Sequence, residues 1–178
     1  KLEEQLENLR SQQNEEEINT RRQNAGFRYN LNEAETRKII DEKLRNAGWE
    51  ADTENIRYSK GSRPEKNKNK AIAEWPTKHG YADYALFVGL KLIAVAEAKK
   101  WNRDIVSDLG QAKDYAKDLV QKDNEEFISE YWEDYKVPFI FSTNGREYIK
   151  QLENKSGIWF LDLRRPTNHP RPLQAWYT

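Results

Sequence analysis

Residues 80–100 read GYADYALFVGLKLIAVAEAKK, and they carry the strongest strand signals in the chain. Tyr81–Val88 and Leu92–Ala98 are apolar at successive positions, and not only at alternate ones. Strands that are covered on both faces have this pattern, whereas strands with one solvated face alternate. The stretch therefore predicts two central strands of a doubly covered sheet, joined by a turn at Gly89-Leu90-Lys91.

Three charged residues, Asp83, Glu97 and Lys99, interrupt these apolar strands. Burying an unpaired carboxylate is costly, so such positions need an explanation. If the turn has three residues, Asp83 lies opposite Glu97, with Cβ atoms about 5 Å apart. Lys99 follows Glu97 by two residues and points the same way. A turn one residue shorter would instead place Asp83 opposite Ala96.

Two carboxylates at this separation repel each other, and one takes a proton unless a cation lies between them. Mg²⁺ suits a site made of two carboxylates, a backbone carbonyl and waters. Lys99 beside the pair could orient a water or stabilise developing negative charge. A structural ion pair between Lys99 and one acid explains the same residues, and the spacing leaves both interpretations open.

Two helical segments add further candidate residues. On a helical wheel Glu33 lies within about 20° of Ile40, on the core-facing stripe, so it is either paired with a partner or part of the metal cleft. Gln111 and Tyr115 are four residues apart and share one helix face at the margin of an apolar stripe. That position suits the lining of a cleft, and an ordinary boundary pair is the alternative.

Composition excludes several classes of protein. The chain has 178 residues, 30 Lys+Arg and 30 Asp+Glu, no Cys and no Met. No apolar run approaches the roughly 18–20 residues that span a bilayer. The absence of Cys excludes disulfide scaffolds and Cys-ligated zinc, and His79 and His169 alone disfavour a histidine-based metal cage or triad. The absence of Met indicates a trimmed protein or a piece of a longer one.

The neutral total charge conceals two segments of opposite sign. Residues 60–70 contain five basic residues and one acid, and they read as a mobile basic loop. Residues 121–135 contain six acids and one lysine. The sequence therefore predicts a polarised surface.

We expect three parts along the chain. Residues 1–26 form a charged, coiled-coil-like helical connector, 27–165 a compact domain, and 166–178 a Pro-rich linker. The order of elements predicts an α/β fold with a central mixed sheet flanked by helices. Outside the hairpin, we expect helices near 33–47, 104–121, 124–135 and 145–152, and strands near 50–58, 138–142 and 157–163.

The combined motifs resemble a known nuclease core. Gly80-Tyr81-Ala82-Asp83-Tyr84, then Glu97-Ala98-Lys99-Lys100, then Gln111-x-x-x-Tyr115 resembles the PD-(D/E)XK nucleases with their QxxxY helix, with Ala82 where Pro would stand. More narrowly, the chain resembles the N-terminal endonuclease domain of type I restriction enzyme R (restriction) subunits. The supporting stretches are residues 33–37, 40–41, 47–49, 111–116, 143–147 and 175–178.

The resemblance implies a restriction-endonuclease-like fold and assigns roles to residues. Asp83 and Glu97 would hold Mg²⁺, for which Mn²⁺ can substitute, and Lys99 would position or activate the attacking water. Glu33 would assist the metal or its water. Gln111 and Tyr115 would support DNA placement and cleavage.

The resemblance also implies the function of the longer protein. Such subunits cleave double-stranded DNA without sequence preference, after ATP-driven translocation by motor domains. This chain has no G-x-x-x-x-G-K-[ST] loop, so ATP would bind only in those absent domains. The partners would be modification (methyltransferase) and specificity subunits, and we expect a cytoplasmic location with no membrane contact. The candidate contacts to DNA phosphates are the basic residues of the loop, Lys60, Arg63, Lys66, Lys68 and Lys70. The alternative is a solvated loop with no partner.

Two other functions remain open at this point. One is a free-standing PD-(D/E)XK nuclease, such as a repair or homing-type enzyme. The other is a non-cleaving DNA-binding or docking module whose carboxylates are structural. An intact set of Asp83, Glu97 and Lys99 argues against the second, because a retired site has no physical reason to keep all three.

Overall fold

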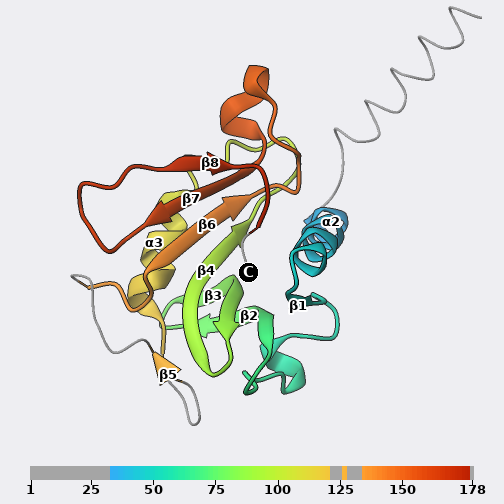
Figure 1. The fold of residues 1–178 in the computed structure, drawn as a ribbon, viewed down its shortest axis with the longest axis vertical. Helices are drawn as coiled ribbons and strands as arrows, with labels where there is room; N and C mark the ends of the chain where they lie inside the picture. Colours follow the sequence, from blue (N-terminus) through green and yellow to red (C-terminus); the bar gives the residue numbers. More distant parts are fainter. Residues whose placement is uncertain (1–32, 121–125, 128–133, 177–178) are drawn as a thin grey trace, which may run out of the picture. The chain divides into compact units, whose positions relative to one another are not determined.

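The structure is a computed structural model that describes residues 33–120, 126–127 and 134–176. These residues form one mixed sheet in the order β1-β2-β3-β4-β6-β7-β8, with β5 also paired to β4 (Figure 1). The predicted α/β class with a mixed sheet is confirmed, and the expected connector at 1–26 lies outside the described residues. The strands are β1 Glu50–Ala51, β2 Asn69–Thr77, β3 Gly80–Val88, β4 Lys91–Ala98, β5 Glu126–Phe127, β6 Phe139–Thr143, β7 Ile158–Asp162 and β8 Arg171–Leu173.

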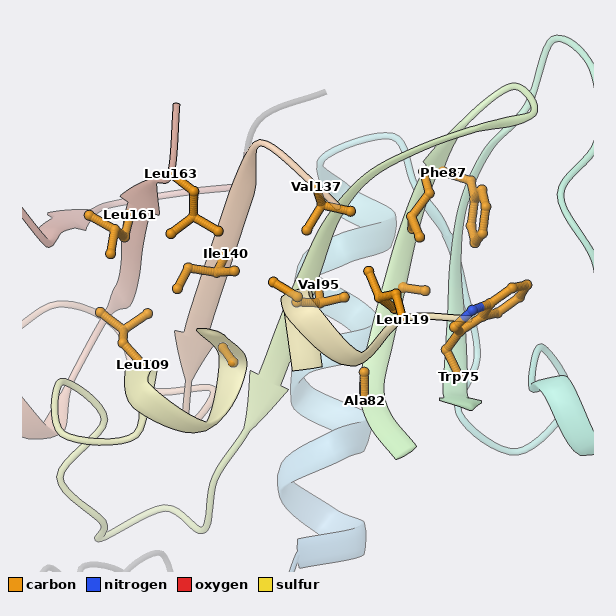
Figure 2. Packing of buried hydrophobic residues seen from close by; sticks show 14 of the residues in the cluster. Trp75, Ala82, Phe87, Val95, Leu109, Leu119, Val137, Ile140, Leu161 and Leu163 are labelled. Atoms are coloured by element: carbon orange, nitrogen blue, oxygen red, sulfur yellow. The ribbon is translucent and has the colours of Figure 1, made fainter. Parts of the chain in front are cut away.

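Helix α3 (Leu109–Asp118) covers one face of the sheet with a core of large side chains. It lies within the expected helix at 104–121 and is shorter, because residues 104–108 form turns. Figure 2 shows Leu109 of α3 in the same cluster as Val95 of β4 and Ile140 of β6. The helix also connects β4 to β6, which are parallel and therefore need a crossover of this kind.

Helix α2 (Glu33–Asn46) covers the other face. Its buried Ile40 and Leu44 pack on a surface that alternate strand positions supply. Gly48, with a φ of 93°, ends the helix, because its N–H bonds Arg45 O and the N–H of Trp49 bonds Leu44 O. The strand positions on this face are mostly small: Ala71, Ala73, Ala94, Ala96 and Ala98, with Tyr84 and Leu86.

A buried polar contact holds α2 in place over β3. The carboxylate of Asp41 accepts hydrogen bonds from Tyr84 OH at 2.9 Å and from the backbone N–H of Thr53 at 2.7 Å. Asp41 is only 4% exposed, so these partners satisfy a group that burial would otherwise penalise. Asp83 directly precedes Tyr84 in β3, so this contact also fixes α2 beside Asp83.

The β3–β4 hairpin has the predicted strands but not the predicted turn. Val88 pairs with Lys91, so the connection is one residue shorter than expected. A β-bulge at Ile93 then inserts one unpaired residue into β4 and restores the register, with Tyr84 opposite Ala96. The next positions along the two strands are Asp83 and Glu97, which therefore lie opposite each other as predicted.

Strand β2 was not expected from the sequence, and it is among the longest strands of the described sheet. It pairs with β3 through most of its length, with Trp75 opposite Ala82. Pro76 lacks an N–H and disfavours a central strand. On the side of β2 away from β3, however, pairing is limited to β1 and to isolated bridges of Ala73 with Arg57 and of Thr77 with Leu119, and none of these involves Pro76. The register places Glu74 opposite Asp83, and Glu74 has a left-handed φ of 52°.

Other expected elements differ in the structure. The strand predicted at 50–58 is limited to β1, because Asp52 accepts hydrogen bonds from the N–H groups of Glu54 and Asn55 and forms a turn. The helix predicted at 145–152 is replaced by an irregular segment and a 3₁₀ turn at Lys150–Lys155. In the range expected as a helix at 124–135, residues 126–127 form β5, and most of the rest lies outside the described residues.

The expected linker at 166–178 packs against the domain over part of its length. Arg171–Leu173 form β8, which pairs antiparallel with β7. Trp176 is 6% exposed, and its ring lies 5.1 Å from that of Phe141. An apolar ring and a strand pairing thus hold this segment on the sheet, although its proline content favoured a linker.

Candidate active site

A cleft of about 450 Å³ opens where the last residues of β4 lie between the first turn of α2 and helix α3. Its lining combines acids, bases and an amide from four different elements. All six residues predicted to be catalytic line it: Glu33, Asp83, Glu97, Lys99, Gln111 and Tyr115, together with Ala98, Lys100 and Arg103.

Asp83 and Glu97 form the acidic centre of the cleft. Asp83 Oδ2 accepts a hydrogen bond from the backbone N–H of Ala98 at 2.8 Å, and Asp83 Oδ1 accepts one from Arg37. Glu97 Oε1 accepts a hydrogen bond from Lys99 Nζ at 2.7 Å. Glu97 Oε2 is buried and has no hydrogen-bond partner among the described residues. One carboxylate oxygen is thus held ready for a cation or a proton.

The pKa values of this pair reflect burial and mutual repulsion. Burial raises the pKa of Glu97, the neighbouring Asp83 raises it further, and the result is a pKa of about 8. Burial also raises the pKa of Asp83, although Arg37 opposes the shift. In the absence of a metal, the two groups therefore retain a proton that ordinary carboxylates would release.

Lys99 links the acidic centre to α3. Its Nζ donates to Glu97 Oε1 and, at 2.6 Å, to Gln111 Oε1. Gln111 Nε2 in turn donates to Tyr115 OH at 2.7 Å, so the Gln–Tyr pair orients the lysine. Burial lowers the pKa of Lys99, but Glu97 outweighs this and the net pKa is raised. A charged ammonium can position a water or stabilise negative charge, but it cannot act as a base.

Glu33 reaches the cleft from the first turn of α2. Its side chain is 52% exposed, and Glu33 Oε1 accepts a hydrogen bond from Arg37 at 3.2 Å. Both alternatives left open by the sequence therefore hold, because Glu33 has a partner and also lines the cleft with Asp83 and Glu97.

The residues of the cleft fit a hard divalent cation. Glu97 Oε2 is an unsatisfied buried oxygen, and Ser142, its neighbour in β6, also has a buried and unpartnered Oγ among the described residues. Each carboxylate oxygen of Asp83 keeps a second lone pair beyond its present hydrogen bond. The described residues contain no cluster of three or more His, Asp or Glu side chains arranged as a metal site, so the fit rests on two carboxylates and a backbone carbonyl.

Two residues that the sequence analysis missed complete the surroundings of Asp83. Arg37 contacts Asp83, Glu33 and, at 3.6 Å, Glu74. Glu74 also pairs with Arg57. The sequence contains a feature that points to each of them. Arg37 lies four residues after Glu33, on the same helix face, and Glu74 interrupts an apolar run. They could be interpreted only once β2 was known to pair with β3.

The basic loop does not reach the cleft. Lys70 is 7% exposed and contacts Glu65, and it pairs across the strands with Phe87, about 13 Å along β3 from Asp83. Lys68 also pairs with Glu65, at 2.8 Å. Arg63 stacks over the ring of Tyr58. The remaining two, Lys60 and Lys66, are exposed.

A metal-free chain should lose stability as the pH rises from about 5 to 8. The folded Glu97 carboxyl keeps its proton to about pH 8, whereas the unfolded one releases it near its ordinary pKa of 4.5. In that window the folded state binds more protons, so the free energy of unfolding falls with rising pH, by roughly 2–4 kcal/mol. Urea unfolding in the presence of a chelator measures this.

Glu97→Gln cannot titrate and should flatten the profile, while the exposed Glu42→Gln should keep it. An unchanged slope in Glu97→Gln would show that the pH dependence arises elsewhere.

Comparisons with known proteins identify the family of the chain. The family described as "Type I restriction enzyme EcoKI endonuclease subunit second domain" matches residues 50–178. The type I restriction enzyme EcoKI endonuclease subunit of Escherichia coli (strain K12) is 44% identical over 176 residues, covering 83% of this chain. The chain spans about 15% of the length of that relative. No solved structure matches the chain significantly.

None of the helices in the described part of the chain has the length and apolar composition needed to cross a bilayer.

The resemblance to type I restriction enzyme R subunits is confirmed by a family match over more than half of the chain and by a relative of high identity. The chain therefore belongs to the family of the type I restriction enzyme EcoKI endonuclease subunit second domain.

Proposed function

We propose that this chain is the nuclease domain of a type I restriction enzyme R subunit and hydrolyses DNA phosphodiesters with a divalent metal. The observation that carries the proposal is the convergence of the six predicted residues on one cleft, with an unsatisfied Glu97 oxygen opposite Asp83. A structural ion pair would need only Lys99 and one acid. The cleft also holds a second acid, a helical acid and the Gln–Tyr pair.

Asp83, Glu97 and the carbonyl of Ala98 would hold Mg²⁺, with Mn²⁺ as a substitute. When bound, such an ion activates water and stabilises the negative charge of a phosphoryl transition state. Lys99, fixed by Glu97 and Gln111, holds its ammonium in the cleft and orients the attacking water. Glu33 lines the same cleft, and its carboxylate would accept a proton from that water.

Two cations at the cleft are placed to bind the DNA backbone. Lys100 and Arg103 line the cleft, are exposed, and share a turn in which Arg103 N–H donates to Lys100 O at 3.0 Å. The structure gives neither side chain an ion pair among the described residues. Lys60 and Lys66 of the basic loop remain candidates for a more distant phosphate contact, whereas the burial of Lys70 weakens the earlier expectation for that residue.

The longer protein would supply what this chain lacks. The relative is named as an endonuclease subunit of a type I restriction enzyme. By that relationship, ATP-driven motor domains would move double-stranded DNA, with modification and specificity subunits as partners, in the cytoplasm. Target selection would then lie outside this chain, and cleavage within it would be independent of sequence.

Lys99→Met should reduce DNA cleavage by at least about 100-fold while DNA binding persists. The substitution keeps the apolar stem but removes the charge that orients the water. Nicking of plasmid DNA with Mg²⁺ measures cleavage, in the assembled enzyme if the fragment alone is slow. Lys113→Met on α3, which lies outside the cleft, is the matched control. If Lys99→Met cleaved DNA at the wild-type rate, the proposed role of Lys99 would be contradicted.

Loss of Lys100 and Arg103 should weaken DNA binding more than loss of the same charge from the basic loop. We expect the double variant Lys100→Ala/Arg103→Ala to bind a duplex about 10-fold more weakly in Ca²⁺, and to have a smaller dependence of affinity on salt. Lys60→Ala/Lys66→Ala is the control of equal charge. A larger loss in that control would place the DNA on the loop.

A further inference from the structure

Arg37 occupies a position among three carboxylates beside the proposed metal site. Its guanidinium contacts Asp83 Oδ1, Glu33 Oε1 at 3.2 Å and Glu74 Oε1 at 3.6 Å. The side chain is 12% exposed, so its charge is fixed in place and weakly screened. Three carboxylates around one point would repel one another without this positive charge.

The backbone holds Glu74 in this arrangement. The register of β2 on β3 places Glu74 opposite Asp83, and the register of β3 on β4 extends to Glu97. The three acids thus occupy one row across three strands. The left-handed φ of 52° at Glu74 is uncommon for a residue with a side chain and marks a position that the surroundings enforce.

The balance of charges around Asp83 favours the binding of one divalent cation over two. Glu33, Glu74, Asp83 and Glu97 are opposed by Arg37, by Arg57 on Glu74, and by Lys99 on Glu97. The three cations leave one net negative charge among the four ionised acids. A single Mg²⁺ reverses the sign of the cluster, and a second would add two further charges to a site that is already positive.

We infer that Arg37 takes the place of a second metal ion, so that the site binds one divalent cation. The inference rests on the proposed function, because it concerns the same metal. Arg37 then supplies a permanent positive charge on the Glu33 side of Asp83. It is a positioning residue, because it acts through Asp83 and not on the substrate.

A neighbouring cavity makes the position of Arg37 accessible to ions. A space of about 560 Å³ on the α2 side is lined by Glu33, Arg37, Arg57 and Glu74, among others. Removing the guanidinium would leave Glu33 and Glu74 lining this space, without the one cation that contacts both of them and Asp83. Oxygen ligands of this kind select hard divalent ions.

The test is the number of Mn²⁺ ions bound per chain, measured by electron paramagnetic resonance of free Mn²⁺ during titration without DNA. We expect one ion for the wild type, two for Arg37→Gln, and one for Arg37→Lys, which keeps the charge. Arg57→Gln is the matched control, since it removes a second arginine from Glu74 without contacting Asp83, and we expect one ion.

Two ions in the wild type, or one in a folded Arg37→Gln, would overturn the inference and leave the proposed function standing. If Arg37→Gln does not fold, Arg37→Met, which keeps the apolar stem and removes the charge, takes its place. Two ions bound by Arg37→Met would support the inference, and one ion would overturn it. No binding by any variant would contradict the proposed function, and the inference with it.

Discussion

The repulsion between the carboxylates of Asp83 and Glu97 is the constraint around which the cleft is organised. The hairpin register places them opposite each other, and burial raises the pKa of both. Lys99 and Arg37 each neutralise one carboxylate from a different side. Burial and mutual repulsion favour a retained proton in the metal-free state, and a divalent cation between the two groups would relieve the same repulsion. The proposed function thus depends on the repulsion between two carboxylates that the fold holds close together.

The rest of the fold keeps these groups in position. The large side chains on one face hold α3, which carries Gln111 to Lys99. On the other face, alanines admit α2, and the buried contact between Asp41 and Tyr84 fixes this helix beside Asp83. The two helices therefore bring polar side chains to the same end of β4 from opposite faces of the sheet. The convergence of these side chains on one cleft is the arrangement on which the proposed catalytic role rests.

Much of the site could be predicted from the sequence, because charged residues inside doubly apolar strands require a reason. The facing of Asp83 and Glu97 was predicted with a turn that is wrong by one residue, and the bulge at Ile93 compensates for the difference. Strand β2 was missed because Glu74 and Pro76 interrupt its apolar run, and the positive φ of Glu74 leaves no signal in the sequence. The role of Arg37 depends on β2 and was missed for the same reason. Charge alone favoured the basic loop, although Glu65 and Tyr58 engage three of its cations.

The central claim is that a divalent cation binds between Asp83 and Glu97. Crystals grown with Mn²⁺ test it most directly, by the anomalous scattering of the metal. The account predicts one peak within coordination distance of Asp83, of Glu97 Oε2 and of the carbonyl of Ala98. A cleft with no peak, in which Asp83 and Glu97 still share a proton at saturating Mn²⁺, would contradict it. A peak at other residues would do the same.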